Sequence, residues 1–144
     1  MQLFVNLFCR DIDRQIDFYR SLLGISELEH SRSPIYRALG DAHFQFGFHA
    51  APAYGLLGLG DRVAPGGILP PVSTYPTFML ADPAAVDEAT RQVPALGGRI
   101  RKGPYPTYYG QWQAVLEDPE GQVFRLSTAS LPAGVSPATP PWES

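Results

Sequence analysis

Arg125 is the residue whose type and position most clearly suggest chemistry. It lies in Val123–Ser127, where apolar and other side chains alternate as in a half-buried strand. Asp118–Gly121 just before it reads as a tight turn, because Pro restricts φ to roughly −65° and Gly accepts conformations that strain other residues. The alternation places Arg125 on the sheet face opposite Phe124 and Leu126. A guanidinium on the inner face of a sheet is suited to binding a carboxylate or a phosphate.

The first third of the chain reads as a strand, a helix and three short strands. Asp11 fits the N-cap of a helix that ends at Gly24, and apolar residues recur between them at helical spacing. The strands are expected at residues 3–9, 25–30, 35–39 and 43–49. In the last of them, three phenylalanines alternate with His43, Gln45, Gly47 and His49, so that the two sets occupy opposite faces.

The same order of elements returns in the second half. Asp82 and Pro83 form a strong helix start, Gly97 ends the helix, and Pro94 should shorten its last turn. Asp87 and Arg91 have the spacing of an ion pair on that helix. Strands are expected at residues 74–81, 99–102, 112–117 and 123–127. The chain is therefore predicted to contain an internal duplication with a period of roughly 70 residues.

Composition excludes several classes of protein. The 144 residues carry a net charge of −3 and Lys102 is the only lysine, which argues against electrostatic binding of nucleic acid. The single Cys9 permits no intrachain disulfide. The apolar N-terminus has no basic leader, and the longest uncharged run, residues 63–81, is interrupted by prolines. A cytoplasmic protein without membrane contact is the expectation.

The pattern Asp11-x6-Phe18-Tyr19-x2-Leu22-Leu23-Gly24, followed by a second module with Gly97-Gly98 and Asp118-Pro119-Glu120-Gly121-x2-Phe124, resembles the vicinal oxygen chelate superfamily. This is the group of glyoxalases, bleomycin-resistance proteins and extradiol dioxygenases. The resemblance implies an α+β fold in which two βαβββ modules with mixed sheets curl into a cup. The expected organisation is one domain over residues 1–129, with modules at 1–49 and 74–129. Residues 50–73 would form a linker or lid, and 130–144 a Pro-rich tail.

The enzymes of this family hold a divalent metal through residues on the first and last strands of each module. Counting from the helix caps and the final hairpin places Phe4, Gln45, Tyr75 and Arg125 at these positions. Phe has no donor atom, Arg is a cation and a phenol is a poor ligand at neutral pH, so only Gln45 is acceptable. No metal site and no cofactor are therefore expected.

The sequence instead predicts an aromatic cup with a few polar groups, which is how small-molecule pockets are usually built. The predicted ligand-binding residues are Phe4, Asn6, His43, Gln45, Tyr75, Thr77 and Arg125. Phe8, Met79 and Ser127 share these faces but are interpreted as packing residues.

Three functions are compatible with this cup. The first is a metal-free binding protein of the bleomycin-resistance type for a small organic, possibly anionic, ligand. The second is a metal-independent lyase, isomerase or transferase in which His43 or Tyr75 acts with Arg125. The third, a metal-dependent glyoxalase or dioxygenase, is disfavoured by the residues above. A homodimer is expected, because the family closes open module edges by pairing modules within one chain or between two.

Overall fold

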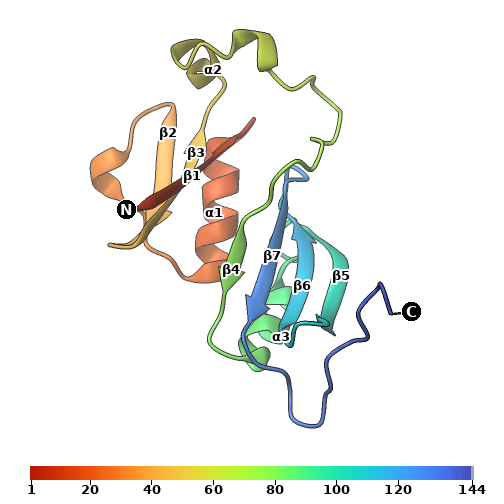
Figure 1. The fold of residues 1–144 in the computed structure, drawn as a ribbon. Coiled ribbons are helices and arrows are strands. Elements are labelled where there is room, and N and C mark those ends of the chain that lie inside the picture. The colour runs from red at the N-terminus through yellow and green to blue at the C-terminus, as the bar shows by residue number, and fades with distance from the viewer. Residues whose placement is uncertain (144) are drawn as a thin grey trace. The chain divides into compact units, whose positions relative to one another are not determined.

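The computed structural model describes residues 1–143, and the chain forms two compact units, Met1–Pro71 and Val72–Ser144. The boundary between the units falls inside the predicted linker at residues 50–73. Each unit has its own sheet and its own helix packed against that sheet (Figure 1). Among the described residues, no helix is both long and apolar enough to cross a lipid bilayer.

The first unit is built on a three-stranded sheet, called sheet A here. In chain order its elements are β1 (Leu3–Phe8), α1 (Ile12–Leu23), the 3-10 turn η1 (Glu29–Ser31), β2 (Tyr36–Gly40), β3 (Phe44–His49), α2 (Pro52–Leu56) and the 3-10 turn η2 (Gly60–Arg62). The strand order is β1-β3-β2, with β1 parallel and β2 antiparallel to β3. The Asp11 carboxylate accepts a hydrogen bond from the Arg14 backbone N–H at 3.0 Å and caps α1, and Gly24 ends α1 with a φ of 64°.

The core of this unit lies between α1 and one face of sheet A. Ile16 and Tyr19 of α1 are fully buried, and the Tyr19 ring meets the Phe46 ring edge-on at 4.9 Å between centroids. Because strand residues alternate, Phe4, Asn6, Gln45 and Gly47 occupy the opposite face of sheet A. We call the face of each sheet that is turned away from the unit's long helix the distal face.

Two expectations for the first unit were wrong. Residues 25–30 do not form a strand: Glu27 makes an isolated bridge with Leu39, and the segment continues into η1. The predicted second strand of the first module is therefore reduced to that bridge. The linker is not a plain loop either, because it begins with α2, whose first residue is Pro52.

The second unit is built on a four-stranded sheet, sheet B. Its elements are β4 (Thr77–Met79), α3 (Pro83–Gln92), β5 (Arg99–Pro106), β6 (Trp112–Glu117) and β7 (Val123–Thr128). The strand order is β4-β7-β6-β5, with β4 parallel to β7 and the other pairs antiparallel. Val86 of α3 and Leu116, Phe124 and Leu126 of the sheet are fully buried. The face of sheet B that carries Arg125 is thus its distal face, as the alternation predicts.

The start of α3 follows the sequence closely, but its expected end at Gly97 is wrong. The Asp82 carboxylate accepts from the Ala85 N–H at 2.8 Å, Pro83 is the first helical residue, and the helix ends at Gln92, before Pro94. The expected Asp87–Arg91 pair is wrong: the Asp87 carboxylate accepts a hydrogen bond from the Trp112 indole at 2.8 Å.

Other details of the second unit also differ from expectation. Arg91 pairs with Glu88, one helical turn earlier. Strand β4 is shorter than residues 74–81, and β5 runs four residues beyond 102. In the C-terminal segment, the Ala138 N–H donates to the Thr107 carbonyl at 3.2 Å, so this part of the tail is tied to the loop between β5 and β6.

Candidate functional site

Arg125 lies on the distal face of sheet B, among neutral partners. Its Nε donates to Thr77 Oγ1 at 3.0 Å, and its Nη1 lies 3.3 Å from both Tyr109 Oη and Gln113 Oε1. The guanidinium carbon lies 4.9 Å from the Tyr75 ring centroid, a cation–π distance. Within residues 1–143, no carboxylate lies within ion-pair distance of Arg125.

A chain of neutral groups continues from Arg125 across sheet B. The Tyr109 hydroxyl donates to Gln113 Oε1 at 2.9 Å, and the Gln113 amide donates to the Tyr105 hydroxyl. Gln113 is buried, whereas Tyr75 and Tyr109 are each about half exposed, at 47% and 48%. The guanidinium therefore lies at the boundary between a buried polar network and two accessible rings. This arrangement can receive an anion with an apolar body.

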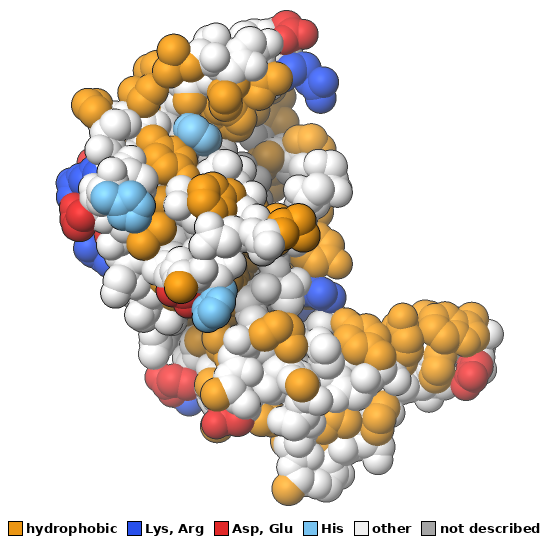
Figure 2. Space-filling model, turned by 60° about the vertical axis from the view of Figure 1, so that its left-hand side comes forward, with side chains coloured by type: hydrophobic (Ala, Val, Ile, Leu, Met, Phe, Trp, Pro, Cys, Tyr) orange, Lys and Arg blue, Asp and Glu red, His pale blue; other side chains and the backbone are white. Residues whose placement is uncertain are grey.

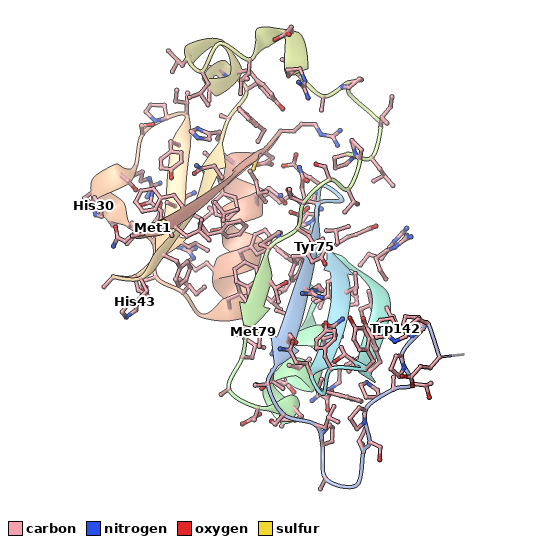
Figure 3. The ribbon with its side chains drawn as sticks, in the orientation of Figure 1. Met1, His30, His43, Tyr75, Met79 and Trp142 are labelled. Atoms are coloured by element: carbon pink, nitrogen blue, oxygen red, sulfur yellow. The ribbon has the colours of Figure 1, made fainter. Side chains whose placement is uncertain are left out.

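Three of the predicted ligand-binding residues therefore share this face. Arg125 contacts both Thr77 and Tyr75, and all three residues belong to the second unit. Figure 3 labels Tyr75, which lies just before β4, and Met79, which is the last residue of β4. Both side chains are exposed. Ser127 is fully buried and donates to Gln111 Oε1 at 2.8 Å, which is consistent with a packing role.

On the distal face of sheet A, Tyr36 joins two predicted residues, and a third lies beside them. The Tyr36 hydroxyl donates to Asn6 Oδ1 at 3.1 Å and accepts from Gln45 Nε2 at 2.6 Å. Phe4 pairs with Gln45 across β1 and β3 and is 53% exposed. Asn6, Gln45 and Phe4 thus lie on one surface of the first unit.

Aromatic rings cover the distal face of sheet A around Phe8 and His49. Phe8 stacks on Tyr54 of α2 at 3.7 Å between centroids, and His49 lies 4.7 Å from the Tyr36 ring. Burial lowers the pKa of His49, and its buried Nδ1 has no hydrogen-bond partner among the described residues. His49 is therefore a neutral imidazole at pH 7, enclosed by aromatic side chains.

His43 does not join this surface. It lies before the first residue of β3 and is exposed, and its side chain points away from the sheet (Figure 3). Its backbone N–H donates to the Asp41 carboxylate at 2.7 Å, as part of the turn between β2 and β3. The expectation that residue 43 belongs to the strand was wrong, because β2 extends to Gly40 and β3 begins only at Phe44, so that the turn lies one residue later than expected. The alternative in which His43 acts as an acid or base stays a prediction.

The strand registers also correct one correspondence between the modules. In the second module, Thr77 lies five residues before the N-cap Asp82 and pairs with Arg125. In the first module, the residue five positions before the N-cap Asp11 is Asn6, and it pairs with Gly47. The first-module equivalent of Arg125 is therefore Gly47 rather than Gln45. A Cβ at Gly47 would overlap both Asn6 Oδ1 and the Tyr36 hydroxyl, so these two side chains occupy the space at that position.

Comparison with known proteins gives the family. The model of the glyoxalase/bleomycin resistance protein/dioxygenase superfamily matches residues 2–126. The chain belongs to this superfamily. A search of curated protein sequences gave no significant match.

Solved structures agree with this assignment. A glyoxalase/bleomycin resistance protein/dioxygenase family enzyme from Burkholderia phytofirmans PsJN is 38% identical, with a TM-score of 0.79 over 88% of this chain and 96% of that one. A glyoxalase-related enzyme from Fulvimarina pelagi is 15% identical, with a TM-score of 0.71 over 96% and 97%. A lactoylglutathione lyase from Agrobacterium tumefaciens is 17% identical, with a TM-score of 0.63 over 89% and 92%. The last two likenesses concern the fold alone.

The metal that the superfamily implies does not fit the residues at its positions. By the structural registers these positions hold Phe4, Gly47, Tyr75 and Arg125. Phe4 and Gly47 have no side-chain donor atom for a metal, and Arg125 is a cation. Only the phenol of Tyr75 is left as a possible ligand. Across residues 1–143, no group of three or more His, Cys, Asp or Glu side chains could hold a metal ion.

Sequence reasoning missed three residues of the site: Tyr105, Tyr109 and Gln113. Tyr105 and Gln113 pair across β5 and β6 after two register irregularities, so their proximity does not follow from strand spacing. Tyr109 comes from the loop between those strands. The Tyr-rich run at residues 105–109 was the available signal, since tyrosines gathered in a loop are common in binding sites.

Proposed function

We propose that the protein binds a small organic anion on the distal face of sheet B and uses no divalent metal to do so. The observation that carries this proposal is the set of Arg125 partners, all of which are neutral. A partly buried guanidinium is stabilised by an anionic partner, and a carboxylate or phosphate supplies one. Tyr75 and Tyr109 then contact the apolar part of the ligand. The distal face of sheet A, with Phe4, Asn6 and Gln45, stays a predicted ligand-binding surface.

Substitution of Arg125 tests the proposal. A thermal-shift screen of aromatic and aliphatic carboxylates and phosphates selects the probe, and calorimetry measures its affinity. Arg125→Lys keeps the charge but loses the two-pronged donor geometry, so binding should weaken by about 1–3 kcal/mol. Arg125→Met should weaken it further.

Two controls accompany this experiment. Arg91→Lys on α3 makes the same chemical change away from the distal face and should leave affinity unchanged. Elemental analysis of the same samples should show no stoichiometric metal. Equal affinity for wild type and Arg125→Met, or one metal ion per chain required for binding, would contradict the proposal.

We also propose that the protein is a homodimer in solution. Large apolar side chains are exposed along the segment from α2 to the end of the linker: Leu56, Leu57, Val63, Ile68, Leu69 and Val72. Figure 2 shows orange side chains gathered at the surface at the top of the view, where Figure 1 draws α2. A run of exposed apolar residues of this length is typical of an interface, and a second copy is the partner that the superfamily leads us to expect.

Light scattering at micromolar concentration should give twice the chain mass. The double substitution Ile68→Glu/Leu69→Glu should shift the mass toward a monomer, because it places two charges in the apolar run. Val135→Glu, which adds a charge at an exposed residue of the C-terminal segment, serves as the control. A monomer mass for the wild type would exclude the dimer.

A further inference from the structure

Lys102 and Arg125 stand in one row across the distal face of sheet B. In the strand registers, Lys102 of β5 pairs with Val115 of β6, Val115 pairs with Arg125 of β7, and Arg125 pairs with Thr77 of β4. Paired residues of neighbouring strands point to the same side of a sheet. The only lysine of the chain therefore shares a face with the guanidinium, two strands away.

The immediate partner of Lys102 is a ring rather than a carboxylate. Its Nζ lies 3.6 Å from the centroid of the Tyr105 ring, whose hydroxyl accepts from Gln113, the residue that also contacts Arg125. Lys102 is exposed, and Tyr105 is half-buried. The two cations are therefore linked through one tyrosine and one buried glutamine.

Glu117, an acid on this face, already has a basic partner. Glu117 of β6 pairs in register with Arg99 and Val123, and its carboxylate lies 3.4 Å from Arg101 Nε. In the described part of the chain, neither Lys102 nor Arg125 lies within ion-pair distance of a carboxylate. Two cations on one face without acidic partners favour a ligand that brings two negative groups.

We propose that the ligand of this face is a dicarboxylate whose acidic groups lie at the two ends of a flat apolar body. One carboxylate binds Arg125 and the other binds Lys102. Neighbouring strands are about 4.8 Å apart, which places the backbones of the two cations about 10 Å apart. Val115 lies between them in the registers and supplies an apolar floor. The Tyr105 ring lies against Lys102 and adds an aromatic surface beside it. This inference rests on the proposed function, since it assumes that Arg125 binds an anion.

Matched probes separate the dicarboxylate inference from the proposed binding of an anion by Arg125. The probes are terephthalate, its monomethyl ester, biphenyl-dicarboxylate and phenyl phosphate, with affinities measured by calorimetry at low salt. At least one dicarboxylate should bind about five- to tenfold more tightly than the monoester, which retains one charge and the same ring. Lys102→Met should abolish this ratio, so that dicarboxylate and monoester bind with the same affinity. Arg91→Met removes a cation from α3 instead and should preserve the ratio.

A spectroscopic readout reports on the wild-type side chain directly. Reductive methylation with isotope-labelled formaldehyde keeps the charge and labels only Lys102 and the chain amino terminus. The Lys102 methyl resonance should shift with a dicarboxylate and should not shift with the monoester. In the Arg125→Met variant, the affinity for both probes should fall.

Each outcome is decisive. If the monoester binds in an Arg125-dependent manner but no dicarboxylate gains affinity through Lys102, the dicarboxylate proposal is wrong and the anion site stands. The same holds if phenyl phosphate, with both charges on one group, matches the best dicarboxylate with no dependence on Lys102. If no probe binds, or binding is independent of Arg125, the proposed function and this inference fail together.

Discussion

Glu27→Gln is expected to lower the free energy of unfolding of the first unit by about 3–5 kcal/mol, the range for breaking a buried ion pair from one side. The Glu27 side chain is 4% exposed and forms a two-pronged pair with Arg37, whose Nε and Nη2 lie 2.8 and 2.7 Å from its two oxygens. The variant leaves Arg37 buried, with the exposed carboxylate of Asp13 at 2.7 Å as its remaining acidic partner. Hydrogen exchange of peptides from β2 measures the loss.

A solvent-exposed pair in the same unit supplies the control. Arg20 and Asp17 pair at 2.8 Å on the surface of α1, with both side chains about half exposed. Asp17→Asn should therefore cost less than about 1 kcal/mol. A Glu27→Gln effect as small as that of Asp17→Asn would show that the Arg37 pair does not stabilise the fold.

The Glu27→Gln effect should depend on pH with a defined sign. The hydrogen bonds from Arg37 hold the pKa of Glu27 below its usual value of 4.5, so the folded state favours the carboxylate more than the unfolded state does. The stabilisation is therefore complete above pH 4.5 and is lost as the pH falls through the lowered pKa. The difference between wild type and Glu27→Gln should shrink over that range, since both chains then carry a neutral side chain at residue 27.

The two long helices, α1 and α3, could be located from the sequence because their signals are local. Asp11, Gly24, Asp82 and Pro83 act through hydrogen bonds and backbone angles within one turn, and all four are found at the predicted helix ends. The duplicated order of elements followed from these ends. Local capping and alternation were thus sufficient for the order of elements. The superfamily was recognised from the resemblance of the Asp11–Gly24 and Asp118–Phe124 motifs.

The segment at residues 25–30 shows where local patterns fail. Its alternation suggested a strand, but Glu27 turns its side chain to Arg37, and the backbone leaves the sheet for η1 after the bridge to Leu39. A buried ion pair between residues ten positions apart outweighs a weak strand preference. Sequence reasoning assigned no role to Arg37, because nothing in its neighbours predicts that it is buried.

The candidate site was predictable only in part, for a similar reason. Arg125, Thr77 and Tyr75 follow from a hairpin and from strand alternation, which are properties of the nearby sequence. Tyr109 and Gln113 depend on how β5 and β6 pair, and that pairing contains two register irregularities. The expected first-module equivalent of Arg125, Gln45, was off by two residues from Gly47. Such an error keeps the residue on the same face of the sheet but changes its partner.

Phe48→Ala is expected to destabilise the first unit by about 3–5 kcal/mol, the cost of a large cavity in a core. Phe48 is fully buried on the α1 side of sheet A, and its ring lies 4.8 Å from the Phe46 centroid and 5.6 Å from the Tyr19 centroid. Removing the ring deletes contacts with two aromatic neighbours that the backbone of β3 cannot close over. Hydrogen exchange of β3 peptides and a denaturant titration followed by circular dichroism measure the change.

Phe4→Ala provides the matched comparison, because it removes the same side chain from the other face of the same sheet. Phe4 lies on β1 and is 53% exposed, so its truncation should change the unfolding free energy by no more than about 1 kcal/mol. If Phe4 belongs to the ligand-binding surface, its loss should appear in affinity for the screened anion instead. Equal destabilisation by the two substitutions would mean that the faces of sheet A have been assigned wrongly, and with them Asn6 and Gln45 as ligand-binding residues.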